Sequence, residues 1–273
     1  MECPSLPVRA RGTKRHGRPP RRRRGLSRIA NVSEPTNKAP GSMHPVDAAA
    51  LAGGLAHELR NPLSTVMVNL TLLAEDLQDR TNEPERLRVR ALKKVETLKH
   101  EAERLKNLCD DFLNLVGPCR LDRKPVDLNG IVARHVEFLE LLARRAGIDL
   151  IDACSDMPVM CPVDESLIRQ AILNLMLNAQ QAMPDGGRLE VATDIDRGSA
   201  VVRVSDSGPG IPPEHRDRIM QPFFSTKTGG TGLGLAITRR IIEEHGGTLE
   251  FDAEVGSGTT FTIRLPVDAP NVT

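Results

Sequence analysis

The chain has 273 residues, a net charge of +1 and 39% hydrophobic residues, enough apolar material for one large or two modest domains. Trp and Tyr are absent and Phe occurs six times, so we expect an aliphatic core and no aromatic surface for stacking nucleic-acid bases. The five cysteines form no Cys-x-x-Cys pair, which argues against a zinc site or a disulfide framework. This cysteine usage favours a reducing cytoplasm. No apolar run is long enough to cross a bilayer, so the sequence predicts a soluble protein.

Residues 1–46 differ in composition from the remainder of the chain. They are rich in Pro, Gly, Arg and Ser without an apolar period, and residues 1–28 hold one acid, Glu2, among many Arg and Lys. We expect a disordered basic tail, because such a segment buries too little to offset its ordering entropy. A weak contact with nucleic acid or an acidic surface, and translation beginning at Met43, are the alternatives.

From Asp47 the pattern becomes helical. Apolar residues recur at steps of three and four within about 120° of arc: Leu51, Leu55, Leu59, Leu63, Val66, Leu70, Leu73 and Leu77. A second helix follows the break at 81–84, with apolar rows Ala91, Leu98, Leu105, Phe112 and Ala102, Cys109, Val116. Residues 47–117 therefore predict an antiparallel helical hairpin, which we expect to pair with a second copy into a four-helix bundle. A monomeric hairpin packed on its own second domain is the alternative.

Gly117-Pro118 ends the second helix, and residues 118–125 are predicted to form a hinge. Residues 126–267 are predicted to form a second domain, followed by a tail at 268–273. The expected helices of this second domain span 128–146, 164–183 and 232–244. Its expected strands span 148–153, 158–162, 188–194, 200–206, 248–252 and 259–265. With Asp185-Gly186-Gly187 taken as a turn between strands, this order predicts a two-layer α/β sandwich with a mixed sheet.

His57 lies about 200° around the first helix from Leu55, so it is predicted to face water. Glu58 is adjacent and can take a proton from the imidazole. Asn61, one turn further, can position a water or a phosphoryl oxygen. The segment from Ala56 to Leu63 resembles the H-box of sensor histidine kinases, with its His-Glu-x-x-Asn-Pro core. The resemblance implies that His57 is phosphorylated, that Glu58 assists as a base and that Asn61 serves in dephosphorylating the partner.

Four further motifs lie in the second domain. Asn174 and Asn178 share one helical face, and their amide oxygens suit magnesium carrying a triphosphate. Asp206 follows a Val-rich strand, where a carboxylate can accept from the amine of adenine, while Gly208 and Gly210 let the backbone approach the ring. Phe223-Phe224-Ser225-Thr226-Lys227 predicts an anchored lid with Lys227 near the phosphates. The last motif opens a helix whose free N–H groups suit phosphate, at Gly230, Gly232, Leu233 and Gly234.

In order and composition these motifs are similar to the N, G1, F and G2 boxes of the ATP-binding fold shared by histidine kinases, Hsp90, gyrase B and MutL. The resemblance covers about residues 47–266. It implies a homodimeric ATP- and Mg²⁺-dependent histidine kinase, with Asn174 and Asn178 handling the metal, whose partner is a response-regulator receiver domain. One departure is Gln180-Gln181, where many members carry a basic residue after the second asparagine; this run resembles the nitrogen-regulator-like branch.

Two alternatives stay open at this point. One is a serine-directed kinase of the anti-sigma type, which uses the same ATP fold without a histidine bundle. The other is a dimeric scaffold with a degenerate ATP pocket. The presence of His57, Glu58 and Asn61 favours a histidine kinase over the first, and the complete set of pocket motifs favours it over the second.

Overall fold

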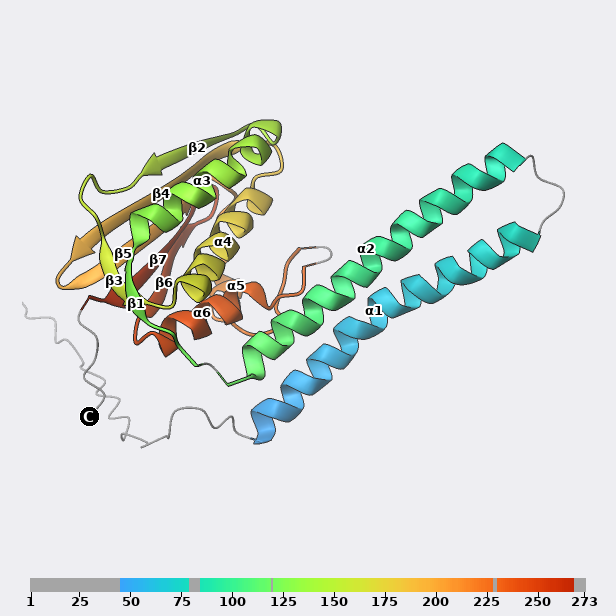
Figure 1. The fold of residues 1–273 in the computed structure, drawn as a ribbon, viewed down its shortest axis with the longest axis horizontal. Helices are drawn as coiled ribbons and strands as arrows, with labels where there is room; N and C mark the ends of the chain where they lie inside the picture. The colour runs from blue at the N-terminus through green and yellow to red at the C-terminus, as the bar shows by residue number, and fades with distance from the viewer. Residues whose placement is uncertain (1–44, 79–83, 119, 228–229, 268–273) are drawn as a thin grey trace, which may run out of the picture. The chain divides into compact units, whose positions relative to one another are not determined.

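The computed structural model describes residues 45–78, 84–118, 120–227 and 230–267. They form a pair of long helices followed by an α/β domain (Figure 1). The predicted fold class, a helical hairpin and then a two-layer α/β sandwich, is confirmed. The predictions for residues 1–44 and 268–273 lie outside the described residues. Within the described ranges, no helix is long and apolar enough to span a membrane.

The hairpin consists of α1 (Pro45–Gln78) and α2 (Pro84–Val116), which run antiparallel (Figure 1). Lys94 of α2 joins them, because its Nζ donates to Asp76 Oδ2 at 2.6 Å and to the Leu72 carbonyl at 2.7 Å. Apolar side chains nevertheless stay exposed along both helices, namely Leu63, Met67, Val68, Leu70, Leu72, Leu77, Val89, Leu92, Val95 and Leu113. One hairpin therefore leaves much of its apolar surface uncovered.

One predicted row of α2 is wrong. Ala102 and Cys109 are exposed, whereas Leu108 and Leu115 are buried. The buried pair is seven residues apart, one position before Cys109 and Val116 in the sequence. The heptad spacing was therefore correct but the companion row was displaced by one residue, because Ala and Cys are apolar enough to occupy an exposed position at little cost.

The α/β domain contains a five-stranded sheet in the order β2-β4-β5-β7-β6, in which β2 and β4 are parallel and the other neighbours antiparallel. Its strands are β2 (Ile148–Ala153), β4 (Gly187–Asp196), β5 (Ser199–Asp206), β6 (Thr248–Glu254) and β7 (Gly258–Pro266). Three helices form the second layer: α3 (Leu128–Arg145), α4 (Glu165–Ala182) and α6 (Gly234–Glu244) (Figure 1). The mixed sheet is as predicted.

Two elements were not predicted, and one connection was assigned wrongly. A small antiparallel sheet pairs β1 (Lys124–Asp127) with β3 (Met160–Val163), and a short helix α5 spans Pro213–Arg216. Strand β1 begins inside the predicted hinge. Residues 185–187 join α4 to β4 rather than two strands, because the parallel pairing of β2 with β4 requires a crossover through α4.

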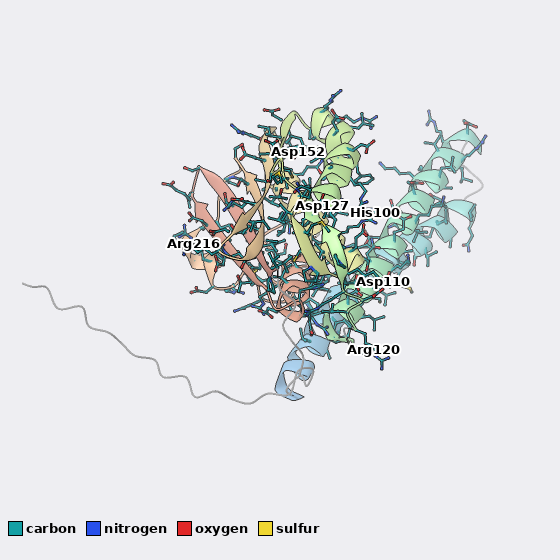
Figure 2. All side chains as sticks on the ribbon, turned by 60° about the vertical axis from the view of Figure 1, so that its left-hand side comes forward. His100, Asp110, Arg120, Asp127, Asp152 and Arg216 are labelled. Atoms are coloured by element: carbon teal, nitrogen blue, oxygen red, sulfur yellow. The ribbon has the colours of Figure 1, made fainter. Side chains whose placement is uncertain are left out.

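Two aspartates begin the helices that position the site. Asp127, labelled in Figure 2, precedes α3, and its Oδ1 accepts from the Asn129 and Val159 backbone N–H groups. Asp164 precedes α4, and its Oδ1 accepts from the Ser166 and Leu167 N–H groups. Asp127 satisfies one free N–H group of the first turn of α3, and Asp164 satisfies two of α4, so both helices begin at a fixed residue.

The core is aliphatic, as the composition predicts. Residues of α3, α4, α6 and the central strands are fully buried, including Leu128, Ile168, Leu175, Met176, Val202, Ile237, Ile242 and Ile263. Among the aromatic residues of the described ranges only Phe261 is buried. The sheet and helix layers are therefore held together by close packing of branched aliphatic side chains.

Two histidines are buried in this domain, His135 and His245. His245 Nδ1 lies 2.7 Å from the Ile241 carbonyl, and its Nε2 accepts from the Asp164 N–H at 3.0 Å. The bond at Nε2 requires a neutral ring that carries its proton on Nδ1. His245 thereby ties the end of α6 to the residue that begins α4.

Acidification is expected to destabilise the domain through these imidazoles. Burial lowers the pKa of His135 and of His245 below 6.5. Because the unfolded chain takes up protons first, the stabilisation is complete above pH 6.5 and is lost as the pH falls towards the folded-state pKa, by up to about 1.4 kcal/mol per pH unit and imidazole. His245→Gln should be less stable at pH 7 but lose less between pH 7 and 5. Urea unfolding measures both, and equal pH slopes for variant and wild type would contradict the assignment.

Candidate functional site

The histidine of the H-box segment is exposed on α1. Asn61, one turn further, is also exposed, while Glu58 is half-buried and Pro62 is buried. Pro62 lies inside α1 and has no N–H to donate to the Glu58 carbonyl, yet the helix continues past it to Gln78. The Thr65 hydroxyl donates to the Asn61 carbonyl at 3.3 Å. The first helix therefore presents His57 to solvent, where another molecule or domain can reach it.

Asn174 and Asn178 are half-buried on α4. Their neighbours in the sequence are buried: Leu175 and Met176 fully, and Ala179 almost so. A Cβ built on Gly234, the first residue of α6, would lie 4.0 Å from Asn178 Nδ2. The ammonium of Lys227 donates to Asn178 Oδ1 at 3.2 Å. Asn178 therefore brings three of the predicted motifs together: the amide pair, the lid lysine and the glycine-rich helix start.

Asp206 ends β5, and its Oδ1 accepts from the Gly208 N–H at 2.9 Å. Burial raises the pKa of this carboxyl above its ordinary value, while the bonds from Gly208 and Thr259 and the charge of Lys227 oppose that rise. Such a carboxylate, held at a strand end by one oxygen, can accept a hydrogen bond from an exocyclic amine with the other.

Glycines allow two close backbone contacts behind Asp206. Gly210 has φ +72°, and a Cβ there would overlap the Glu254 carbonyl oxygen. Gly258 has φ +113°, and a Cβ there would overlap the carbonyl of Asp206 itself. Gly258 is the first residue of β7, and its close contact with the Asp206 carbonyl fixes the position of Asp206.

A residue that the sequence analysis missed braces the same loop. Arg216 of α5, labelled in Figure 2, donates from Nε to the Ile211 carbonyl at 3.2 Å and from Nη2 to the Ala253 carbonyl at 2.6 Å. It therefore connects the loop after β5 to β6. A single arginine three residues after Pro213 has no sequence pattern that distinguishes it from a solvated surface residue.

The lid phenylalanines are half-buried, as expected for an anchor. Phe224 packs against the ring of His215, with the two ring centroids 5.5 Å apart, and against the guanidinium of Arg218, which lies 4.4 Å from the Phe224 centroid. Phe223 adopts a left-handed φ of +64°, and its N–H donates to the Gly232 carbonyl at 3.1 Å. A Cβ on Gly232 (φ +66°) would lie 2.5 Å from the Phe223 carbonyl carbon, so this crossing requires glycine.

The glycine-rich segment opens α6 two residues later than predicted, at Gly234. Leu233, at the N-cap, is fully buried and provides no side-chain cap, so the backbone N–H groups of the first turn can serve a ligand. Gly230 lies against the lid, because a Cβ there would meet the Ser225 hydroxyl at 2.6 Å. This end of α6 therefore suits an anion.

The donor set of the site fits a nucleoside triphosphate and a divalent cation. It combines one carboxylate, two amide side chains, one ammonium and a free helix start. Within residues 45–78, 84–118, 120–227 and 230–267, no group of three His, Cys, Asp or Glu could by itself hold a metal. A cation at Asn174 and Asn178 would consequently depend on phosphate oxygens for further ligands, as Mg²⁺ commonly does.

The fold and site define a class: an α/β nucleotide-binding domain that follows a helical hairpin with an exposed histidine. Residues 163–269 match the model of the histidine kinase-, DNA gyrase B- and HSP90-like ATPases, and residues 48–116 match the His Kinase A phospho-acceptor domain. The chain belongs to the sensor histidine kinase family. Membership of this family implies ATP binding.

Three matches to two relatives illustrate the similarity. The sensor histidine kinase ZraS of Escherichia coli K12 is 36% identical over 218 residues, which cover 80% of this chain and 45% of ZraS. The catalytic domain of histidine kinase ThkA is 31% identical, with a TM-score of 0.50, over 54% of this chain and 96% of that one. ThkA in complex with response regulator TrrA is 26% identical, with a TM-score of 0.67, over 81% of this chain and 62% of that one. The chain thus spans less than half the length of ZraS.

Alanine substitutions at two glycines separate backbone strain from steric overlap. Gly256 has φ +82° with open space around its Cβ position, so Gly256→Ala should cost about 1 kcal/mol of stability from the left-handed conformation alone. Gly210→Ala adds the overlap with the Glu254 carbonyl and should cost about 3 kcal/mol or more. Urea unfolding measures both, and equal losses would show that the close contact is absent.

Proposed function

We propose that this chain is an ATP-dependent protein histidine kinase that phosphorylates itself on His57 and passes the phosphoryl group to an aspartate of a separate response regulator. The observation that carries the proposal is the exposed imidazole of His57, beside Glu58 and one turn from Asn61, on a chain that also holds the nucleotide site. Neither feature alone would distinguish a kinase from an ATPase or a scaffold.

The nucleotide-binding roles follow the chemistry of each group. Asp206 accepts from the adenine amine, with Gly208 and Gly210 shaping the loop around the ring. The first turn of α6, with Gly230, Gly232 and Gly234, receives the phosphates. Lys227 neutralises phosphate charge. Mg²⁺, when bound, would neutralise more of it, and the amide oxygens of Asn174 and Asn178 would hold it.

The proposed phosphorylation forms a bond between one imidazole nitrogen of His57 and the γ-phosphorus of ATP. The bond from that phosphorus to the β,γ-bridging oxygen breaks, and ADP leaves with its electron pair. Glu58 takes the proton from the other imidazole nitrogen. Little covalent help is needed beyond this, since phosphoryl transfer depends mainly on alignment and charge neutralisation.

The proposed partners are a second copy of this chain and a response-regulator receiver domain. The apolar side chains exposed along the hairpin support pairing into a four-helix bundle. The structural similarity to ThkA, whose complex with the response regulator TrrA is known, supports phosphotransfer between proteins. Asn61 is proposed to position water when a phosphorylated regulator is hydrolysed. We also propose that the protein acts in the cytoplasm, where ATP is available. Within the family, we assign it to the nitrogen-regulator-like branch.

His57→Gln is expected to abolish incorporation of label from γ-labelled ATP while leaving ATP affinity within about twofold of wild type, since His57 is not on the ATP-binding domain. The wild-type label should be lost in acid and retained in base, as for a phosphoramidate. Filter binding and calorimetry measure the two quantities. Label that persists in His57→Gln, or a label stable to acid, would support a serine-directed kinase instead.

Asn178→Ala is expected to lose both autophosphorylation and the Mg²⁺-dependent part of ATP affinity, because it removes the amide oxygen that accepts from the lid lysine and is proposed to hold the metal. Calorimetry with ATP in the presence of Mg²⁺ and of EDTA isolates that part. Asp206→Asn serves as the comparison. It should weaken ATP and adenosine alike, about tenfold or more, since it replaces a charged acceptor. Unchanged Mg²⁺ dependence in Asn178→Ala would contradict its role.

A further inference from the structure

The ammonium of Lys227 is held by three amide oxygens at the end of α4. Its Nζ donates to Gln181 Oε1 at 2.9 Å, to Asn178 Oδ1 at 3.2 Å and to the Asn178 carbonyl at 3.3 Å. An ammonium has three donors, so this set can satisfy it. Asp206 adds attraction through its charge without a direct bond being formed. The three acceptors come from a single turn of one helix, since Asn178 and Gln181 are three residues apart.

The lid itself is folded so that Lys227 points to this turn. The Ser225 hydroxyl accepts from the Lys227 N–H at 3.1 Å and donates to the Lys227 carbonyl at 3.3 Å. The Gly230 N–H donates to the same carbonyl at 3.3 Å, and a side chain at Gly230 would meet the Ser225 hydroxyl. This tight turn and the three amide contacts are separate features that lead to the same placement of the ammonium.

Gln181 is the member of this set that the nucleotide-binding roles above do not use. Its residue is solvent-exposed, so packing does not explain it. A basic side chain at this position would place a second cation against Lys227, whereas the amide oxygen accepts from it. Gln180-Gln181 stand where many members of the family carry a basic residue, and at this point of the helix the lid supplies the ammonium of Lys227.

We propose that Gln181 is a positioning residue for nucleotide binding. Its side-chain oxygen holds the ammonium of Lys227 on α4, so that a cation from the lid takes the place of the basic residue that many members of the family carry on this helix. This ammonium also donates to Asn178 Oδ1, the oxygen assigned to the metal. Binding of Mg²⁺ and nucleotide would therefore move the ammonium from Asn178 to the phosphates, while Gln181 Oε1 keeps its hydrogen bond to Lys227. This inference rests on the proposed function, because it takes the nucleotide to bind at Asn178.

Replacing Gln181 by Leu tests the docking contact, with Gln180→Leu as the matched control, because Gln180 is the adjacent residue of the same type and about 100° around the helix. Gln181→Leu should weaken ATP about fivefold, the worth of one net hydrogen bond, and leave adenosine unchanged. Backbone amides at 223–227 should exchange hydrogen faster in the nucleotide-free variant. Gln180→Leu should match the wild type in all three measurements.

A charge exchange tests whether the lid lysine replaces a fixed cation. Lys227→Met should weaken ATP by about tenfold or more, since a charge-assisted hydrogen bond is lost. Adding Gln181→Lys to that variant should recover most of the loss, because the new ammonium starts from the same turn of α4. Gln181→Lys alone should speed lid exchange through repulsion of Lys227.

The outcomes separate this inference from the proposed function. If wild type binds ATP but Gln181→Leu behaves like Gln180→Leu, or if the double variant is no better than Lys227→Met, the positioning role is overturned and the kinase proposal stands. If wild type fails to bind ATP, the kinase proposal falls. The docking contact is then judged by lid exchange alone, where equal rates in the two leucine variants would reject it.

Discussion

The nucleotide site depends on close backbone contacts between the end of β5 with its following loop and the β6–β7 hairpin. Gly210 lies against the Glu254 carbonyl and Gly258 against the Asp206 carbonyl, and neither contact leaves room for a Cβ. The loop after Asp206 is thereby bound to the β6–β7 hairpin, with Arg216 bonded across the same junction. Asp206 consequently has a defined direction before any ligand arrives, and preorganised polar groups bind ligands at a lower entropic cost.

Polar residues in an otherwise apolar helix are the second feature of the site. Asn174 and Asn178 lower the intrinsic stability of α4, since Asn is a weak helix former. The helix is secured instead by its buried aliphatic face and by the Asp164 cap. Stability and ligand chemistry are thus assigned to different faces of one helix, which permits two amides and a lid ammonium to meet beside the core without weakening the fold.

Much of this architecture could be predicted from the sequence, because periodicity, caps and glycine-rich turns are local signals. The hairpin and the mixed sheet were confirmed. What could not be predicted depends on contacts distant in sequence: β1 forms only because β3 pairs with it, and the contact of Lys227 with Gln181 joins residues 46 apart. The burial of Leu108 in place of Cys109 was missed for a different reason, since both residues are apolar and their rows are adjacent on the helix.

His245 has a consequence for the distant end of the same two helices. It joins the last turn of α6 to the first residue before α4, while Gly234 at the other end of α6 lies beside Asn178 near the end of α4. With 11 residues, α6 is about 16 Å long. The His245 imidazole thus joins α4 and α6 at one end of the pair, and the proposed phosphate site lies between them at the other end. A substitution at the His245 end would alter the spacing of the phosphate end without touching any group that meets the nucleotide.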